Sequence, residues 1–153
     1  ERFGRLDILV TCAGILRDRM VFNMSEEEWD SVLAVHLKGT FNCIRAAVPP
    51  MKEVRSGRII NISSTAGQRG EAYYSPYSAS KAAVVNLSKN VAREYATKKV
   101  RVNTLCPGFF PAEQNRKVLT PDRVASILGH TPAGRFGEAR ELIRGGELPP
   151  RRG

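Results

Sequence analysis

The chain has 153 residues, enough for one domain of ordinary size and too few for a large multidomain machine. Hydrophobic residues make up 42% and charged residues 25%, which excludes disordered, collagen-like and low-complexity chains. Lys and Arg outnumber Asp and Glu by 24 to 15, and this net charge of +9 favours acidic ligands such as phosphates. No run approaches the ~20 apolar residues of a membrane span, and no secretion signal is visible, so we expect no membrane association.

The three cysteines, Cys12, Cys43 and Cys106, form no C-x-x-C pair and have no neighbouring His at metal-ligand spacing. We therefore expect no metal site, reduced thiols and a cytoplasmic protein. Free cysteine is among the most buried residue types, so each of the three is predicted to be a small buried hydrophobe.

In chain order, the first element is an apolar run at residues 6–10 that Gly14 stops, which indicates a buried strand. Ser25 and Glu28 form a capping box, the start of a helix that we expect to end at Pro49 and Pro50. The apolar stripe of this helix comprises Trp29, Leu33, Leu37, Phe41, Ile44 and Val48.

A turn at Ser56 and Gly57 separates this first strand and helix from a second strand and helix. Residues 58–62 indicate a strand, residues 63–76 a loop, and residues 77–96 a second long helix. A third strand at 100–105 stops at Pro107 and Gly108.

Strands that alternate with long helices predict an α/β protein with a parallel sheet covered on both faces and right-handed crossovers. About three strands with flanking helices correspond to part of a doubly wound, Rossmann-like fold. Ligands bind beyond the carboxyl ends of the strands in such sheets. The informative residues should therefore follow Val10, Ile62 and Leu105.

Beyond Gly108 the pattern loosens, with short helix candidates at 121–128 and 138–143. We interpret residues 1–137 as a partial Rossmann-like domain in which 109–137 form a substrate-covering segment. Residues 138–153 are interpreted as a short helix and a disordered tail, because residues 144–153 show no periodicity.

Tyr77 and Lys81, in Y-S-A-S-K, carry the chemistry. Four residues apart on a helix, the two side chains share one face. An ammonium group favours the phenolate, so lysine and a cationic nicotinamide ring could together lower the tyrosine pKa from about 10 toward neutrality. Such a tyrosine serves as a general acid or base on a carbonyl or alcohol, and the hydroxyl of Ser64 could bind the same oxygen.

Four motifs in register resemble the short-chain dehydrogenase/reductase family in its classical branch. They are T-C-A-G at 11–14, I-N-I-S-S at 60–64, Y-S-A-S-K at 77–81 and C-P-G at 106–108. The resemblance implies an oxidoreductase that interconverts a secondary alcohol and a ketone with NAD or NADP. It implies catalytic roles for Tyr77 as acid/base, Ser64 as the group that polarises substrate, and Lys81 as ligand of the nicotinamide ribose.

The resemblance also implies a cofactor-binding set: Cys12, Ala13, Gly14, Tyr77, Lys81, Pro107, Gly108 and Phe110. Two residues depart from the family pattern, which has Asn at the positions of Cys12 and His36. Cysteine cannot replace both roles of an amide, whereas the imidazole of His36 could hold a water that connects to Lys81 in a proton relay. The alternative for His36 is a histidine packed in the core.

The glycine-rich phosphate loop that opens members of this family does not occur in the chain, and the last strand of the family is also missing. We therefore expect an internal fragment of a longer enzyme, with doubtful activity by itself. The alternative is an inactive remnant that acts by association, because relatives of this kind pair through two long helices into homo-oligomers.

The sequence leaves two classes of substrate open. Residues 109–115 and 130–137 resemble sugar-acid oxidoreductases, whereas I-L-R-D-R-M and V-H-L-K-G-T-F are similar to relatives that act on acyl thioesters or steroids. Nucleic-acid binding is not expected, because no helix concentrates the basic residues and no aromatic platform interleaves with them.

Overall fold

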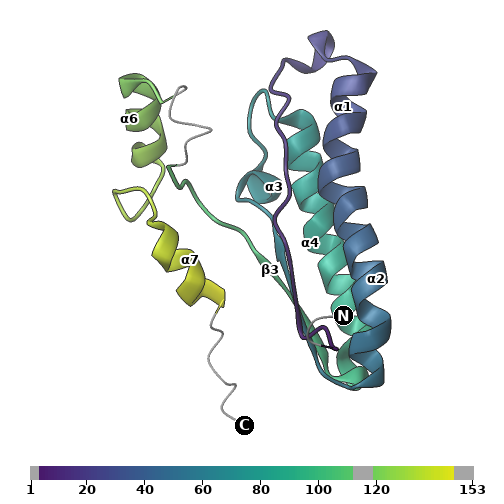
Figure 1. The fold of residues 1–153 in the computed structure, drawn as a ribbon. Helices are drawn as coiled ribbons and strands as arrows, with labels where there is room; N and C mark the ends of the chain where they lie inside the picture. The colour runs from purple at the N-terminus through teal and green to yellow at the C-terminus, as the bar shows by residue number, and fades with distance from the viewer. Residues whose placement is uncertain (1–3, 112–118, 147–153) are drawn as a thin grey trace. The chain divides into compact units, whose positions relative to one another are not determined.

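A computed structural model describes residues 4–111 and 119–146 (Figure 1). The chain divides into two compact units, Glu1–Cys106 and Pro107–Gly153, and each is described by itself. Residues 112–118 of the expected substrate-covering segment and residues 147–153 of the expected tail lie outside the described part of the chain.

The first unit contains a three-stranded parallel sheet in the order β1-β2-β3. Its strands are β1 (Ile8–Thr11), β2 (Gly57–Ile62) and β3 (Val100–Leu105). Thr11 pairs with Asn61 and Asn61 with Thr104, so the carboxyl ends of the three strands meet at one edge. The predicted α/β class and parallel sheet are confirmed.

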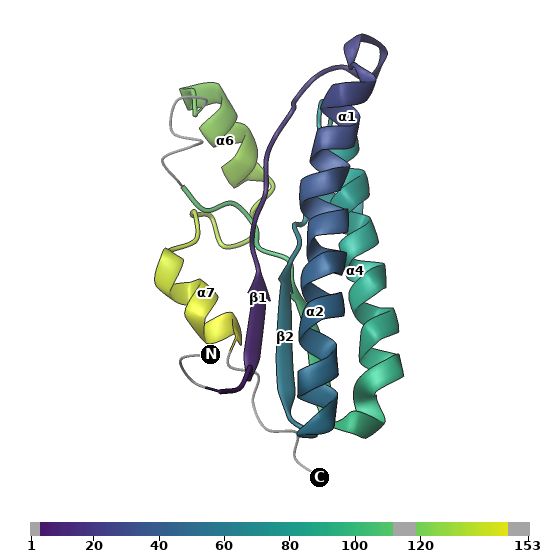
Figure 2. The same cartoon turned by 45° about the vertical axis from the view of Figure 1, so that its right-hand side comes forward.

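The long helices α1 (Glu26–Leu33), α2 (Gly39–Glu53) and α4 (Ser75–Tyr95) lie on one face of this sheet (Figure 2). The strands lie in the sheet in the same order as in the sequence. Right-handed connections from β1 to β2 and from β2 to β3 therefore both pass over the same face of the sheet. Among residues 4–106, no helix covers the other face, so the expectation of helices on both faces is not met there. Ile8 and Val10, whose side chains point to the other face, are 60% and 50% exposed.

The core lies between the sheet and these helices. Its buried side chains are Ile44, Ala47, Val48, Met51, Ile59, Val91, Val100 and Val102. The prediction that the helix ends at Pro49 and Pro50 was wrong, because α2 continues to Glu53. The reason lies in Met51. Proline removes backbone donors, but burial of Met51 against the sheet favours the last turn despite that loss.

Three further local features were not predicted. A π-helical turn, η2 (Ala34–Lys38), joins α1 to α2. The expected loop after β2 contains a short helix, α3 (Ala66–Arg69), and Gly70 ends it with φ of 72°. Helix α4 begins at Ser75, because Pro76 fits the first turn of a helix, where its missing N–H costs nothing.

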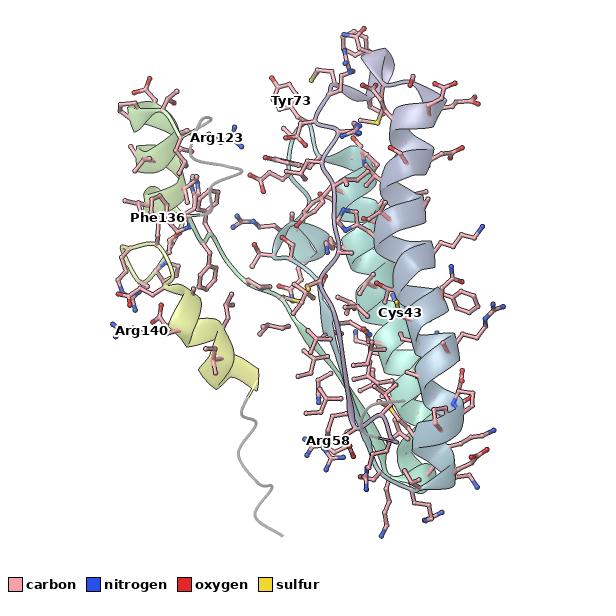
Figure 3. All side chains as sticks on the ribbon, viewed as in Figure 1. Cys43, Arg58, Tyr73, Arg123, Phe136 and Arg140 are labelled. Carbon is pink, nitrogen blue, oxygen red and sulfur yellow. The ribbon has the colours of Figure 1, made fainter. Side chains whose placement is uncertain are left out.

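The short 3-10 elements are η1 (Val21–Asn23) before α1 and η3 (Ala96–Lys98) after α4. The cysteines are free, as expected, but Cys12 and Cys43 are exposed and Cys106 is half-buried. Cys43 belongs to α2 (Figure 3) and is exposed, so the prediction that all three cysteines are buried hydrophobes was wrong.

The second unit contains α6 (Pro121–Gly129) and α7 (Ala139–Gly146). Thr120 caps α6 by accepting a hydrogen bond from the Arg123 amide. The Phe109 and Phe136 rings pack with their centroids 5.2 Å apart. Helix α7 extends to Gly146, so its last turn includes residues that were predicted to belong to the tail.

Within the ranges 4–111 and 119–146, no helix is long and apolar enough to cross a membrane. The same residues contain no group of three His, Cys, Asp or Glu side chains that could hold a metal ion.

Candidate active site

The candidate site is at the carboxyl edge of the sheet, where Lys81 joins helix α4 to strand β2. The Lys81 Nζ donates a hydrogen bond of 2.8 Å to the Ile62 carbonyl, the last residue of β2. The Ser63 hydroxyl donates one of 2.8 Å to the Lys81 carbonyl. These two bonds fix the helix at the point where the strand ends.

Tyr77 and Lys81 share one face of α4, as their spacing predicts, and the Lys81 Nζ is 5.5 Å from the centroid of the Tyr77 ring. Ser64 lies between β2 and α3, and its side chain is close enough to the phenol to act on the Tyr77 pKa by hydrogen bonding. The structure therefore brings Ser64, Tyr77 and Lys81 together.

Asn61 is a positioning residue that the sequence analysis did not single out. It is fully buried, and its amide accepts a hydrogen bond of 2.8 Å from Thr11 and donates one of 2.8 Å to Ser88. Ser88 in turn donates to the Val84 carbonyl within α4. One side chain thus links β1, β2 and α4, and a polar residue inside an apolar strand is the pattern that could have revealed it.

The Tyr77 phenol has a perturbed pKa in the chain without a cofactor. Burial raises its pKa above the ordinary value, a hydrogen bond with Ser64 opposes that change, and the charges of Asp18 and Glu71 raise the pKa further. The phenol consequently holds its proton at neutral pH, which suits a proton donor. The lowering of this pKa that was expected from lysine and a bound nicotinamide together stays a prediction.

The pKa of Lys81 is shifted in the opposite direction to that of Tyr77, downward. It is 6% exposed, and burial lowers its pKa from 10.5 to about 8, although the nearby Cys12 and Cys106 oppose the change. Both cysteines directly follow strands whose ends lie at this edge. The amine thus reaches its titration range near physiological pH.

His36 is buried within the π-helical turn η2, with 2% exposure. Its Nε2 is 3.0 Å from the Ile15 amide nitrogen and 2.7 Å from the Ile15 carbonyl oxygen, so either can be its partner, depending on the tautomer. Its ring meets Tyr77 edge-on at 5.2 Å. The Nδ1 atom has no hydrogen-bond partner among the described residues, which favours a group that binds there.

Gly14 packs directly against His36. A Cβ atom at this position would lie 2.6 Å from the His36 Cε1, too close for any real contact. The resemblance assigned Ala13 and Gly14 to the passage of the cofactor, and the structure adds an internal reason for the glycine. Cys12, Ala13 and Gly14 are all exposed where β1 ends.

The remaining expected cofactor residues, Pro107, Gly108 and Phe110, belong to the second unit. Open space surrounds the position of a Cβ at Gly108, whereas one at Gly137 would lie 2.3 Å from the Phe110 ring. Gly137 also donates to the Phe109 carbonyl, so Phe110 is held against that glycine within this unit.

The comparison with protein families identifies the chain. The model of the short chain dehydrogenase family matches residues 1–122, most of the chain. The chain therefore belongs to the short chain dehydrogenase family, as the four motifs predicted.

Several curated proteins similar to the chain are named 3-oxoacyl-[acyl-carrier-protein] reductase. The chain is 42% identical over 142 residues to the 3-oxoacyl-[acyl-carrier-protein] reductase FabG of Staphylococcus aureus (strain Mu50), covering 93% of this chain and 57% of that protein. It is 41% identical over 145 residues to the FabG of Thermotoga maritima, covering 94% and 58%. It is 40% identical over 142 residues to the FabG of Vibrio cholerae, covering 93% and 58%. The chain thus spans a little more than half the length of these relatives.

We predict that Gly14→Ala lowers the free energy of unfolding by about 1–3 kcal/mol, because its methyl group overlaps the His36 ring. In a His36→Ala background the same substitution should cost much less, and urea unfolding of the four proteins measures this coupling. Gly108→Ala, which meets no atom, is the control. Equal costs in the two backgrounds would show that the steric contact is absent.

We predict that Lys81→Met stabilises the chain at pH 7. Below pH 8 the lysine is charged in both the folded and the unfolded chain, so the whole cost of burying the charge is present. That cost is on the order of 1–3 kcal/mol, and the lost bond to Ile62 offsets about 1 kcal/mol of it. Between pH 8 and 10.5 the folded lysine is neutral first, so wild-type stability rises and the advantage of methionine falls.

Urea unfolding at pH 7 and at pH 10 measures this difference for Lys81→Met, with Lys89→Met on the exposed side of the same helix as control. The control should change stability little at either pH. A variant that is less stable than wild type at pH 7, or an advantage that is the same at both pH values, would contradict the buried charge.

Proposed function

We propose that the chain carries the catalytic part of an NAD(P)-dependent oxidoreductase that interconverts a secondary alcohol and a ketone by hydride transfer. The observation that carries this proposal is the convergence of Ser64, Tyr77 and Lys81 at the carboxyl edge of the sheet. Membership of the short chain dehydrogenase family and the reductase names of the relatives support it.

In the reducing direction, Tyr77 donates its proton to the oxygen of the carbonyl group whose carbon receives the hydride. Its raised pKa keeps that proton in place until the oxygen becomes more basic. Ser64 binds the same oxygen and orients it toward the phenol. The Lys81 Nζ and the His36 ring lie 5.5 Å and 5.2 Å from the Tyr77 ring centroid. The His36 Nδ1, which has no hydrogen-bond partner within the described part of the chain, offers a second polar atom for returning a proton to the site.

The residues present fit a nicotinamide cofactor. The Lys81 ammonium has three N–H donors, of which Ile62 takes one, so others are available for the hydroxyl groups of a ribose. Cys12, Ala13 and Gly14 offer an exposed segment of small side chains at the same edge. When bound, the nicotinamide supplies or accepts the hydride.

Of the two substrate classes that the sequence left open, the relatives favour the acyl class. They are named as reductases of 3-oxoacyl groups carried by acyl-carrier protein. We therefore propose a 3-oxoacyl compound as the substrate. The preference between NAD and NADP is a separate question, which the assay below decides.

Tyr77→Phe should lower kcat by roughly 10²–10⁴ while it leaves the affinity for substrate nearly unchanged, because it removes only the transferred proton. The test measures oxidation of NADPH and of NADH with a 3-oxo ester. Tyr95→Phe, the same change at the other end of α4, is the matched control. Equal turnover by wild type and Tyr77→Phe would refute the role of the phenol.

A second candidate function, association with other subunits, is favoured by an apolar groove of about 570 Å³ on the outer side of the helices. Leu33, Leu37, Phe41 and Leu87 line it, and Phe41 is 44% exposed. Asp30 and Lys38 add charges of both signs, so a second copy could meet this face with opposite charges paired. This candidate does not need turnover by the chain itself.

Leu37→Asp should abolish self-association by placing a charge in the groove, and sedimentation velocity across a range of concentrations measures it. Val54→Asp, an exposed position at the end of α2 outside the groove, should leave association unchanged. A wild-type chain that stays monomeric, or a Leu37→Asp variant that associates like wild type, would exclude this candidate.

A further inference from the structure

Two segments of the first unit meet beside Tyr77. In the connection from β1 to α1, both backbone polar atoms of Ile15 lie within hydrogen-bond distance of the His36 Nε2, and the His36 ring meets the Tyr77 ring at 5.2 Å. Further along this connection, the Arg19 amide donates a hydrogen bond of 3.0 Å to the carbonyl of Tyr73, in the loop before α4. The connection therefore passes beside the reacting phenol and then joins the loop at Tyr73.

Tyr73 lies at the rim of the site. The residue after it, Tyr74, has its ring 5.9 Å from that of Tyr77. The Tyr74 carbonyl accepts a bond of 2.7 Å from the Ser78 amide at the start of α4. The Tyr73 side chain is 56% exposed (Figure 3). Its ring is thus accessible to a ligand that has its carbonyl group at Tyr77.

The backbone of Tyr73 is strained. Its φ of 70° is a left-handed conformation, which glycine adopts freely and a bulky residue seldom adopts. The hydrogen bond from Arg19 holds the loop in this conformation. Strain of this kind is concentrated at functional sites, where the surrounding structure maintains it. An exposed aromatic ring held in this way beside a reacting group indicates contact with the substrate.

Exposed apolar side chains accompany Tyr73 on the connection. Leu16 is 47% exposed and Met20 is 44% exposed, and they precede and follow Arg19, whose amide bonds to Tyr73. Arg19 itself pairs with Glu28 at 2.9 Å, so its charge has a partner. We call Leu16, Met20 and Tyr73 the apolar rim. Single exposed hydrophobic residues are common, but three large ones where two segments meet beside a catalytic group indicate a binding surface.

We infer that the apolar rim binds the hydrocarbon chain of a 3-oxoacyl substrate and sets the preferred chain length. The inference rests on the proposed role of Tyr77, because a carbonyl held at the phenol leaves the rest of the substrate to lie along the neighbouring segments. Similar proteins are named as reductases of 3-oxoacyl groups. Beyond the oxo carbon such a group is a row of methylene groups, which an apolar surface removes from water. A sugar acid has hydroxyl groups in that place and gains nothing from the rim.

The size of the effect follows from the burial of methylene groups. Complete burial of one methylene group raises affinity about fourfold, and contact of one side with the rim should raise it roughly twofold. Four additional methylene groups therefore raise the affinity on the order of tenfold. The gain should appear in KM and leave kcat unchanged, because the chain is bound equally before and during the reaction.

The experiment compares methyl acetoacetate with methyl 3-oxooctanoate, two uncharged 3-oxo esters that differ by four methylene groups. Binding of each to the full chain with NADPH is followed by NMR of 13Cζ-labelled tyrosine. The signals of Tyr77 and Tyr73 are assigned by their loss in Tyr77→Phe and Tyr73→Asn. Both esters should shift the Tyr77 signal, and the long ester alone should shift that of Tyr73. Where turnover is measurable, KM and kcat for the two esters are the second readout.

The test variant combines Tyr73→Asn with Leu16→Ser. Asparagine tolerates a positive φ, so this change removes the ring without adding strain. Tyr73→Phe keeps the ring and should keep the preference for the long ester. Tyr73→Asn alone should remove part of the preference, and it replaces the double variant if the latter does not unfold cooperatively in urea.

The matched control is Lys99→Asn. Lys99 is exposed, has a φ of 58° and directly precedes β3. It therefore lies at the amino edge of the sheet, opposite the edge that carries the site. The same replacement at this position should leave the preference for the long ester as in wild type.

Wild type should bind the long ester roughly tenfold more tightly than the short one, and the double variant should bring the two esters to within about threefold. Three results would overturn the inference: equal affinity of wild type for both esters, an unchanged preference in the double variant, or the same loss of preference in Lys99→Asn. In each of these cases, binding of the esters at Tyr77 leaves the proposed function standing. A wild-type chain that neither binds nor reduces either ester would overturn the proposed function and this inference together.

Discussion

The site depends on the attachment of helix α4 to the end of strand β2 through Lys81. The ammonium binds the Ile62 carbonyl, and the Lys81 carbonyl accepts from Ser63, so both ends of this residue are tied to the strand. Gly67 of α3 approaches Lys81 so closely that a Cβ there would lie 2.8 Å from it. Because Tyr77 is one turn away on the same helix, these contacts fix the phenol relative to Ser64.

Burial of Lys81 lowers the stability of the folded chain and also shifts the lysine pKa toward neutral pH. An ammonium with 6% exposure loses hydration, which lowers the Lys81 pKa to about 8. Burial also raises the Tyr77 pKa, with Asp18 and Glu71 adding to it. The chain alone thus provides a protonated phenol beside a readily titrated amine, and the positive charge of an oxidised nicotinamide, when bound, would favour the phenolate.

His36 connects this chemistry to the end of β1. The π-helical turn places its ring between the Ile15 backbone and Tyr77, and Gly14 leaves room for it. Burial lowers the His36 pKa, with the charge of Lys81 contributing, so the imidazole is neutral at physiological pH. A neutral imidazole can accept a proton at one nitrogen and donate at the other, which suits a relay better than a fixed charge.

Local spacing by itself determined the strands, the long helices, the parallel sheet and the Tyr77–Lys81 pair, because apolar periodicity and i, i+4 spacing are properties of short segments. Tertiary contacts decided the rest. Burial of Met51 carries α2 past two prolines, and the strand order puts both crossovers on one face. The hydrogen bonds of Asn61 with Thr11 and Ser88, and the backbone bond from Arg19 to Tyr73, join residues far apart in the chain. No short segment of sequence determines these contacts, since burial and electrostatic fields arise only when the segments pack together.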